Sequence, residues 1–489
     1  MRTIATTPID SHTRSEKLQK SFILLSVLIG GLAGGLVVVY NRPFNIFVMV
    51  FGLLVVLATI LSAEFGLLVL VFLVYTRFSD IMIEFHGFPS VAKLFTILLV
   101  VAILARWTIF RIRPKGWVIP TILLIAYGLA GLGSILYSPV PDRSWIRFTD
   151  YVKDGTIAVI VVILLQRGKA LRGVLWVMLI SGIFLSSLSV YQYATSSFSN
   201  NYGGFAQSGL NQIVGAIDEF RVGGPVGDPN FFAQIVVVLV PISFERYLHE
   251  KKNLLKLLAL LSLVLSVLSV ILSYSRGGFL AMALVFIVLV FMYPPRIYYV
   301  PVIIISILIF TLFLPPSYLD RIITLGDLVK PSNTLIAEDL SYRGRLSENL
   351  AAWDMFRTHP LLGVGLNSYS YLFQQYSQNQ GIALVAGERQ PHNLYLEVAA
   401  ETGVVGFSLF ALLIGFTFRT IYLARRKFIE KKYFNYAGMV SGFGLGLLGY
   451  LTAAMFIHGA FARYMYLLIG VGLSLPLVVE NTRLEEQPD

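Results

Sequence analysis

Four short segments carry residue types that together could bind a phosphate and accept a proton. Three supply arginines: Arg221 in RVGGPVGDPNFFA, Arg276 in SYSRGGFL, and Arg343 with Arg345 in YRGRLS. The fourth supplies His392, in QPHNLYLE. Guanidinium groups bind phosphate oxygens through paired hydrogen bonds and never lose their charge. If these segments meet in the fold, they would form a phosphate or diphosphate site with a base beside it.

His392 comes just before a strongly apolar stretch, so a helix is expected to begin beside it. The positive end of a helix favours a neutral imidazole over an imidazolium, and a neutral imidazole is a competent general base. The alternative is that His392 only caps the helix. The other histidines lack the set of outward arginines that accompanies His392 and are weaker candidates: His12, His86, His249, His359 and His458.

Two of the arginines also have structural interpretations. Arg276 lies at a Ser-Arg-Gly-Gly turn, where Gly277 and Gly278 are expected to let a ligand approach the backbone. An arginine at a membrane interface can instead extend to lipid headgroups. Arg221 precedes Asp228-Pro229, a pair typical of a helix start.

The elements that must position these residues belong to a membrane protein. The 489 residues are 56% hydrophobic, with a mean hydropathy of +0.75, which is too apolar for a chain whose surface faces water. Cys is absent, so disulfides and Cys-ligated metals are excluded. We attribute the net charge of +11 to membrane topology and not to nucleic acid.

Apolar runs of about 17 to 25 residues predict an all-α polytopic membrane protein with about 12 to 14 transmembrane helices. The predicted spans are 21–40, 44–61, 65–79, 94–110, 117–137, 151–166, 173–193, 230–247, 254–274, 278–293, 298–314, 393–418, 436–456 and 459–479. Acidic residues are sparse at their centres, which argues against an ion-coupled transporter.

Lys and Arg concentrate in alternate connections between these helices. With the N-terminus inside, about 23 of the 38 are cytoplasmic, which is the positive-inside pattern. The expected organisation is a cytoplasmic tail (1–20), transmembrane helices (21–193), a first outward loop (194–229), transmembrane helices (230–314), a large periplasmic loop (315–392), transmembrane helices (393–479) and a cytoplasmic tail (480–489).

The large loop is expected to contain an amphipathic helix that lies along the membrane surface or caps the bundle. The predicted apolar stripe consists of Leu346, Leu350, Trp353 and Phe356, with Arg345, Glu348 and Asn349 away from it. Elsewhere the chain has no G-x-x-x-x-G-K-[ST], H-E-x-x-H or G-x-S-x-G motif. The chain also lacks a pair of closely spaced Asp residues of the kind that holds a metal-nucleotide sugar. These absences disfavour an ATPase, a zinc protease and a cytosolic nucleotide-sugar transferase.

Three segments resemble the O-antigen ligase and O-antigen polymerase superfamily of bacterial envelope glycosyltransferases. They are SRGG at 275–278, GRLSENLAAWDMFRTHPLLGVG at 344–365, and PHNLYLEVAAETGVVG at 391–406. The motif-level similarity covers roughly residues 200–410, and hydropathy alone agrees beyond it. The resemblance implies a fold similar to the wider, GT-C-like class of lipid-linked sugar transferases.

The resemblance also implies a reaction. Such enzymes move a glycan from undecaprenyl diphosphate to an acceptor hydroxyl, without metal, nucleotide or other cofactor, on the periplasmic face of the inner membrane. The family's basic positions match Arg276, Arg345 with Arg343 as a near alternative, and Arg221 as an additional basic position. Its histidine matches His392, the catalytic base of an inverting displacement, with Asn393 and Glu397 in support.

The acceptor is left open by the sequence. A ligase, slightly preferred, would transfer the glycan to a lipid A-core or similar acceptor, whereas a polymerase would extend a second lipid-linked repeat. A rival from another class is a transporter or flippase of a lipid-linked or anionic solute, and a third is a scaffold without catalysis. The expected partners are the donor lipid, the acceptor glycan and the bilayer.

Overall fold

The computed structural model describes residues 43–109, 111, 113–213, 217–294, 340–378, 387–459 and 462–482. The chain divides into two units, Met1–Gly66 and Leu67–Asp489. The first contributes α2 (Pro43–Leu61), and the second contains the candidate site. The predicted helices at 21–40 and 298–314 lie outside the described residues.

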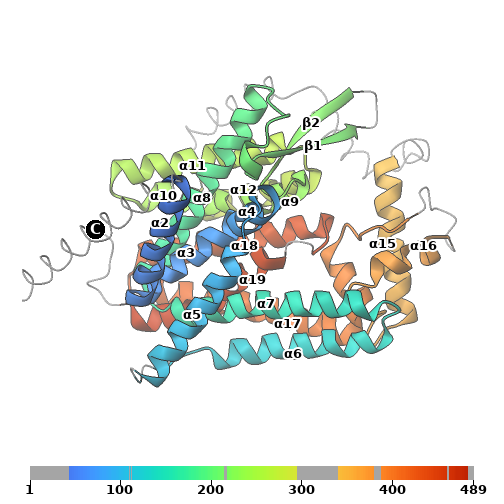
Figure 1. Ribbon diagram of the computed structural model, residues 1–489, viewed down its shortest axis with the longest axis horizontal. Helices are drawn as coiled ribbons and strands as arrows, with labels where there is room; N and C mark the ends of the chain where they lie inside the picture. Colours follow the sequence, from blue (N-terminus) through green and yellow to red (C-terminus); the bar gives the residue numbers. More distant parts are fainter. Residues whose placement is uncertain are drawn as a thin grey trace, which may run out of the picture. The chain divides into compact units, whose positions relative to one another are not determined.

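The described part of the chain is almost entirely helical, which confirms the all-α polytopic prediction (Figure 1). Within it, eight helices are long and apolar enough to cross a membrane, or nine if the pair α3 and α4, bent by 52°, is one span. The second unit contains α3 (Ala63–Tyr75, which begins in the first), α4 (Phe78–His86), α5 (Val91–Thr108), α6 (Val118–Ser134), α7 (Pro141–Leu164), α8 (Gly168–Ala194), α9 (Pro229–Val237), α10 (Leu239–His249), α11 (Asn253–Leu272), α12 (Arg276–Met292), α15 (Leu340–Thr358), α16 (Tyr369–Gln378), α17 (Leu394–Glu430), α18 (Phe434–Ala453) and α19 (Ala462–Asn481).

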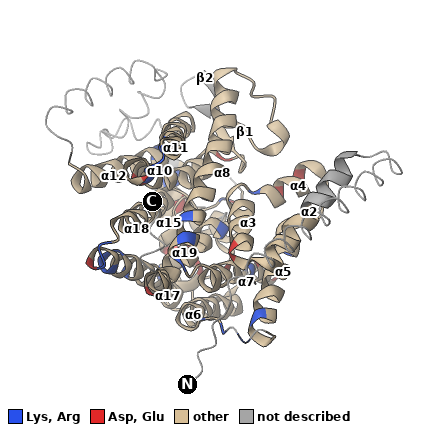
Figure 2. Cartoon of the chain, turned by 90° about the vertical axis from the view of Figure 1, so that its left-hand side faces the viewer, with Lys and Arg blue, Asp and Glu red and all other residues tan. Residues whose placement is uncertain are grey.

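The helices of the second unit pack on one another over long stretches. α6, α7 and α17 run side by side in Figure 1, and α19 packs on both α7 and α17. Charged residues are few along the helix surfaces, as Figure 2 shows. Apolar surface that faces outward from these helices can face lipid at no cost, so it does not need a partner.

The loop predicted to face outward, 194–229, contains a short hairpin that the helix-based prediction did not include. β1 (Gln207–Ile213) pairs antiparallel with β2 (Ile217–Gly224), and β2 packs on α8 and α9. The predicted helix start after the hairpin is confirmed, because Asp228 Oδ1 accepts hydrogen bonds from two backbone N–H groups of α9. α9 and α10 together form the span predicted at 230–247.

A break in α17 explains two of the glycine-containing motifs. Gly403 has a φ of 64° in the left-handed region, and the loop after α15 fills the gap, with Val404 N donating to Pro360 O at 2.8 Å. A Cβ at Gly403 would lie 2.3 Å from Leu361 O. Only glycine permits this approach, so the ETGVVG and HPLLGVG sequences interlock and fix α15 against α17.

The prediction of the apolar face of α15 is wrong for two of its four residues, which are exposed. Leu346 is 36% and Trp353 is 47% exposed, whereas Ala351, Ala352 and Met355 are fully buried in a core that includes residues of α16 and α17. Small alanines allow close helix packing, and the larger apolar side chains stay on the outer face. Glu348 is 1% exposed on the buried face, and so it points to the candidate site.

Candidate active site

The loop after α18 connects three helix starts. After the short 3-10 helix η4 (Ala454–Phe456), the ring of His458 lies 6.1 Å from the ring of His392 and 5.1 Å from that of Phe231, at the start of α9. A Cβ on Gly277, at the start of α12, would lie 2.6 Å from Phe456 Cβ. The N-termini of α9, α12 and α17 therefore meet around residues 456–458.

Each of these helix starts is capped by a side chain. The caps are Asp228 for α9, Ser275 for α12 and Asn393 for α17. Helix N-termini carry a partial positive charge and direct backbone N–H groups outward, which favours anions. Three such ends in one region provide a favourable setting for a phosphate group.

His392 is held by a buried carboxylate. Its Nδ1 lies 2.7 Å from Glu348 Oε2, and Glu348 also accepts a hydrogen bond from Arg389 Nη1 at 2.9 Å. An ionised carboxylate only accepts hydrogen bonds, so Nδ1 carries the proton and Nε2 is left as the basic nitrogen. Asn393 accepts the helix hydrogen bonds, so the capping role proposed as the alternative for His392 belongs to its neighbour.

Arg276 occupies the first position of α12 and is half-buried. The expectation that Gly277 and Gly278 expose backbone to a ligand is wrong. A Cβ on Gly278 would lie 2.6 Å from Ala233 Cβ, just as one on Gly277 would meet Phe456. These glycines are needed for close helix packing, and that packing places Arg276 beside the His458 loop.

Arg221 is 6% exposed and extensively bonded within the protein. Its Nε donates to Ser273 O at 2.8 Å and its Nη2 donates to Asn230 Oδ1 at 3.2 Å. These bonds tie β2 to the turn that carries Arg276 and to the start of α9. A direct contact between Arg221 and substrate stays a prediction.

Arg345 and Arg343 lie in the first turns of α15. Arg345 is half-buried and precedes Glu348 by three positions, so both residues share one side of the helix. A Cβ on the intervening Gly344 would lie 3.2 Å from Arg389 Nη1. The side chain of Arg343 lies outside the described part of the structure.

Glu397 is 8% exposed and supports the His458 loop, because its Oε2 accepts a hydrogen bond from Gly459 N at 2.7 Å. Arg147, on α7, donates to Gly459 O at 2.6 Å. His458 therefore lies close to Arg147, an arginine that is remote from it in the sequence. Burial, together with the nearby His392 and Arg147, lowers the pKa of His458 to about 4, so its ring is neutral at physiological pH.

Several site residues were missed from the sequence. Arg389 stands three residues before His392, and its position beside a Pro-His pair was an available signal. Glu348 was expected on the polar side of the helix, away from the apolar stripe. It is buried because a different face of α15 packs against the protein. His458 and Arg147 meet through Gly459, a contact between α7 and the loop before α19 that no local spacing indicates.

A comparison with protein families shows which known proteins the middle of the chain resembles. Residues 261–411 match the family model described as O-antigen ligase. Over these residues the chain is similar to O-antigen ligases. The match confirms the resemblance to the superfamily and supports glycan transfer by a glycosyltransferase-type enzyme. No curated protein matches the chain.

The matched segment contains Arg276, Arg345, Glu348 and His392, whereas Arg221, Arg147 and His458 lie outside it. The candidate site of this multi-pass membrane protein therefore combines residues of the matched segment with residues from the helices before and after it.

Proposed function

We propose that the protein transfers a glycan from undecaprenyl diphosphate to an acceptor hydroxyl on the periplasmic face of a bacterial inner membrane. The observation that carries the proposal is the pair His392 and Glu348, a histidine oriented by a buried carboxylate and surrounded by helix N-termini. Nε2 of His392 takes the proton of the acceptor hydroxyl as its oxygen attacks the anomeric carbon. The glycosyl C–O bond breaks, and undecaprenyl diphosphate leaves with the bonding electrons.

The arginines supply the charge stabilisation in this mechanism. As the diphosphate leaves, negative charge grows on its oxygens, and Arg276 and Arg345 are assigned to receive it through bidentate hydrogen bonds. Arg343 and Arg221 are assigned supporting positions. A single displacement of this kind inverts the anomeric configuration and does not require a metal.

Ligase activity is the preferred form, with glycan transferred to lipid A-core or a similar acceptor. The test is the product formed when purified protein receives a labelled undecaprenyl-diphosphate glycan together with either lipid A-core or unlabelled lipid-linked repeats. Label on lipid A-core identifies a ligase. Longer lipid-linked chains identify the polymerase alternative. If the label appeared on neither acceptor, both forms of the proposal would be refuted.

A transporter of lipid-linked solute is a second candidate, and one observation favours it. Acidic residues are predicted to be sparse at the helix centres, and yet Arg147, Asp154, Glu397 and Glu401 line one cavity among the helices. Intramembrane ionisable clusters often mark transport pathways. A transporter would move the labelled lipid across the bilayer without forming a new glycosidic bond.

Glu348→Gln is expected to lower kcat by at least about tenfold while donor binding changes little, because an amide N–H₂ facing Nδ1 stabilises the wrong tautomer. Initial rates and donor binding, measured on the same preparation, test this. Glu430→Gln is the matched control, because it makes the same chemical change at an exposed position at the far end of α17. An unchanged kcat in Glu348→Gln would contradict the orienting role.

The proposed orientation predicts that Gln374→Cys is labelled from outside and Lys432→Cys only from inside. Both positions are exposed, on α16 and between α17 and α18, and the chain has no native Cys to interfere. The reason is the concentration of Lys and Arg near the 419–435 connection. Membrane-impermeant maleimide on intact and opened cells measures it. Reversed labelling would place the candidate site on the cytoplasmic side and reject a periplasmic reaction.

A further inference from the structure

Next to His458 a polar cavity extends among the helices. Its volume is about 70 Å³, and its walls come from α6, α7, α17, α18 and α19. Because a buried water needs about 10–15 Å³ measured in this way, the cavity holds several waters or a polar group of comparable size. Neither the base nor the arginines of the proposed mechanism use this space.

Two carboxylates one helical turn apart form one wall. Glu397 and Glu401, on α17, are 8% and 6% exposed. Backbone N–H groups position both: Gly459 N donates to Glu397 at 2.7 Å, and Glu401 accepts from Tyr369 N at 3.3 Å and from the backbone of Asn367. A carboxylate has about four lone-pair positions, so both retain capacity to accept hydrogen bonds from a ligand.

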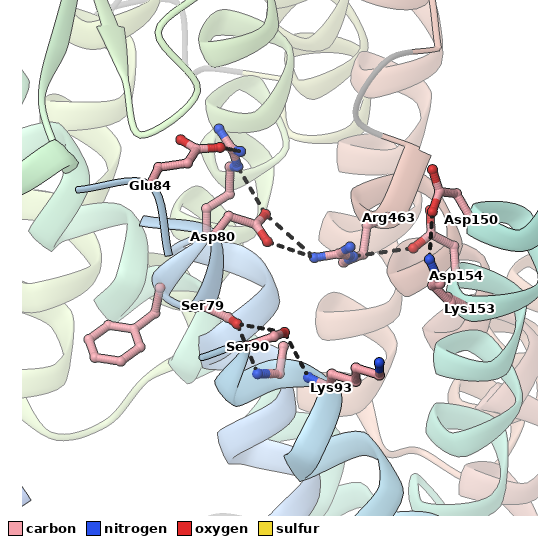
Figure 3. A network of polar contacts seen from close by, with 12 residues as sticks. Ser79, Asp80, Glu84, Ser90, Lys93, Asp150, Lys153, Asp154 and Arg463 are labelled. Carbon is pink, nitrogen blue, oxygen red and sulfur yellow. Dashed lines mark hydrogen bonds and ion pairs between the residues drawn. The ribbon is translucent and has the colours of Figure 1, made fainter. Parts of the chain in front are cut away.

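A third carboxylate, Asp154, is neutralised from outside the cavity. Arg463 Nε donates to Asp154 Oδ1 at 3.2 Å and its Nη1 approaches Asp80 Oδ1 at 3.4 Å. Figure 3 shows Arg463 between these two carboxylates, with α4 on one side and α7 on the other. Arg77 binds Asp80 in turn, at 3.2 Å. The chain of alternating charges is anchored in the fold and is not available to a phosphate.

The polar lining of the cavity suits a neutral ligand better than an anion. Arg147 faces two glutamates, and its Nη2 is already bonded to Gly459 O. Since Arg147 is the one arginine or lysine among the described residues that line the cavity, a diphosphate would find few donors there. A neutral molecule with many hydroxyl groups can use the whole lining, because hydroxyls donate to carboxyl oxygens and accept from guanidinium.

The other walls are aromatic. Tyr127 and Phe148 contribute from α6 and α7, Phe410 from α17, Tyr450 from α18 and Tyr466 from α19. A sugar ring presents apolar C–H faces and a rim of hydroxyls, so it matches walls that combine aromatic faces with acids and an arginine. Water alone would not require the aromatic part.

We propose that this cavity is a subsite for one sugar ring. His458 lines the cavity and also lies next to His392, so a sugar bound here would be close to the proposed base. The proposal rests on the proposed glycan transfer and adds the contacts that recognise the sugar. The ring can belong to the donor glycan or to the acceptor, and the two sources share this chemistry. Glu397, Glu401 and Arg147 bind its hydroxyls, and the aromatic residues pack on its faces.

Tyr127→Phe and Glu401→Gln test the subsite. Gln keeps one oxygen that can accept from Tyr369 N, and elution as a monodisperse peak after solubilisation checks that the fold is retained. The controls are Tyr422→Phe and Glu430→Gln, which are 62% and 58% exposed on the far part of α17. The measured quantities are the KM for donor, the KM for acceptor, and inhibition by glycan-free undecaprenyl diphosphate.

Each cavity variant should raise one KM about tenfold, as expected for loss of a hydrogen bond to a charged or phenolic group, while inhibition by undecaprenyl diphosphate stays unchanged. A rise in donor KM assigns the ring to the donor, and a rise in acceptor KM assigns it to the acceptor. Unchanged KM values, or equally weakened inhibition by undecaprenyl diphosphate, would overturn the proposal.

Failure of the subsite and failure of the transfer reaction can be separated. Oligosaccharide released by mild acid from the host's own lipid-linked glycan is titrated into His392→Ala protein by calorimetry. Binding that Glu401→Gln weakens supports the subsite even if no transfer occurs. If the wild type transfers glycan but Glu401→Gln changes neither the KM values nor the binding of the oligosaccharide, the proposed function is retained and the subsite is rejected.

Discussion

His392→Ala is expected to reduce glycan transfer by about 10²- to 10⁴-fold, the contribution of a positioned general base. The Nε2 of His392 is the only basic atom assigned to the acceptor proton, since Nδ1 is bonded to Glu348. Binding of the lipid-linked donor should persist, because the arginines and helix N-termini hold the diphosphate. The measurements are initial transfer rates and donor binding on the same preparation.

His359→Ala is the matched control for this variant, since His359 is exposed just after α15 and takes no part in the site. His392→Asn extends the test. Because Asn393 already caps α17, Asn at 392 should keep the fold and lose the rate. An active His392→Asn enzyme with the wild-type pH profile would exclude His392 as the base.

Arg276→Ala is expected to lower kcat/KM about a hundredfold or more, as removal of a charge-stabilising donor does in other enzymes. Arg276→Lys should recover only part of the activity, because an ammonium group lacks the bidentate fork. The same order of loss is expected for Arg345→Ala. Donor binding and transfer should both fall, unlike the separation expected for His392→Ala.

The control for the arginine variants is Arg357→Ala, in the exposed last turn of α15. It removes one positive charge and leaves the His458 loop untouched, so it corrects for general electrostatic attraction of the anionic donor. If Arg276→Ala and Arg345→Ala both transferred at the wild-type rate, the diphosphate would have to bind elsewhere.

Much of the fold could be predicted because the length and hydropathy of a segment identify a transmembrane helix. α8 and α11 lie within a few residues of their predicted spans. α7 begins ten residues before its predicted start at 151, because its first turns carry charged residues such as Arg147 that face the cavity and not the lipid. Hydropathy alone cannot distinguish a polar loop from a polar helical turn that lines an interior space.

The face of α15 could not be predicted for a related reason. In a membrane protein an apolar side chain is stable against lipid as well as in the core, so the stripe containing Leu346 and Trp353 does not identify the buried side. The buried side is decided by Ala351 and Ala352, whose small size permits contact with α17. Burial of Glu348 follows from that packing, and so does its contact with His392, 44 positions away.

The candidate site was predicted in its parts and not in its arrangement. His392 and Arg276 were identified from the residue types and the motif sequence, but their common neighbour His458 was set aside because its arginine partner is remote in sequence. That arginine, Arg147, reaches the loop through Gly459 across 312 positions. Contacts of this separation are set by helix packing, which one sequence does not specify.

The most direct test of the central claim is transfer by the purified protein in liposomes. The donor carries one label on the glycan and another on undecaprenyl diphosphate, and lipid A-core is supplied on the side of the 315–392 segment. The account predicts that glycan label appears on the acceptor in equal amount to released undecaprenyl diphosphate, and that His392→Ala produces neither. Movement of both labels together across the bilayer, with no new glycosidic bond, would contradict it.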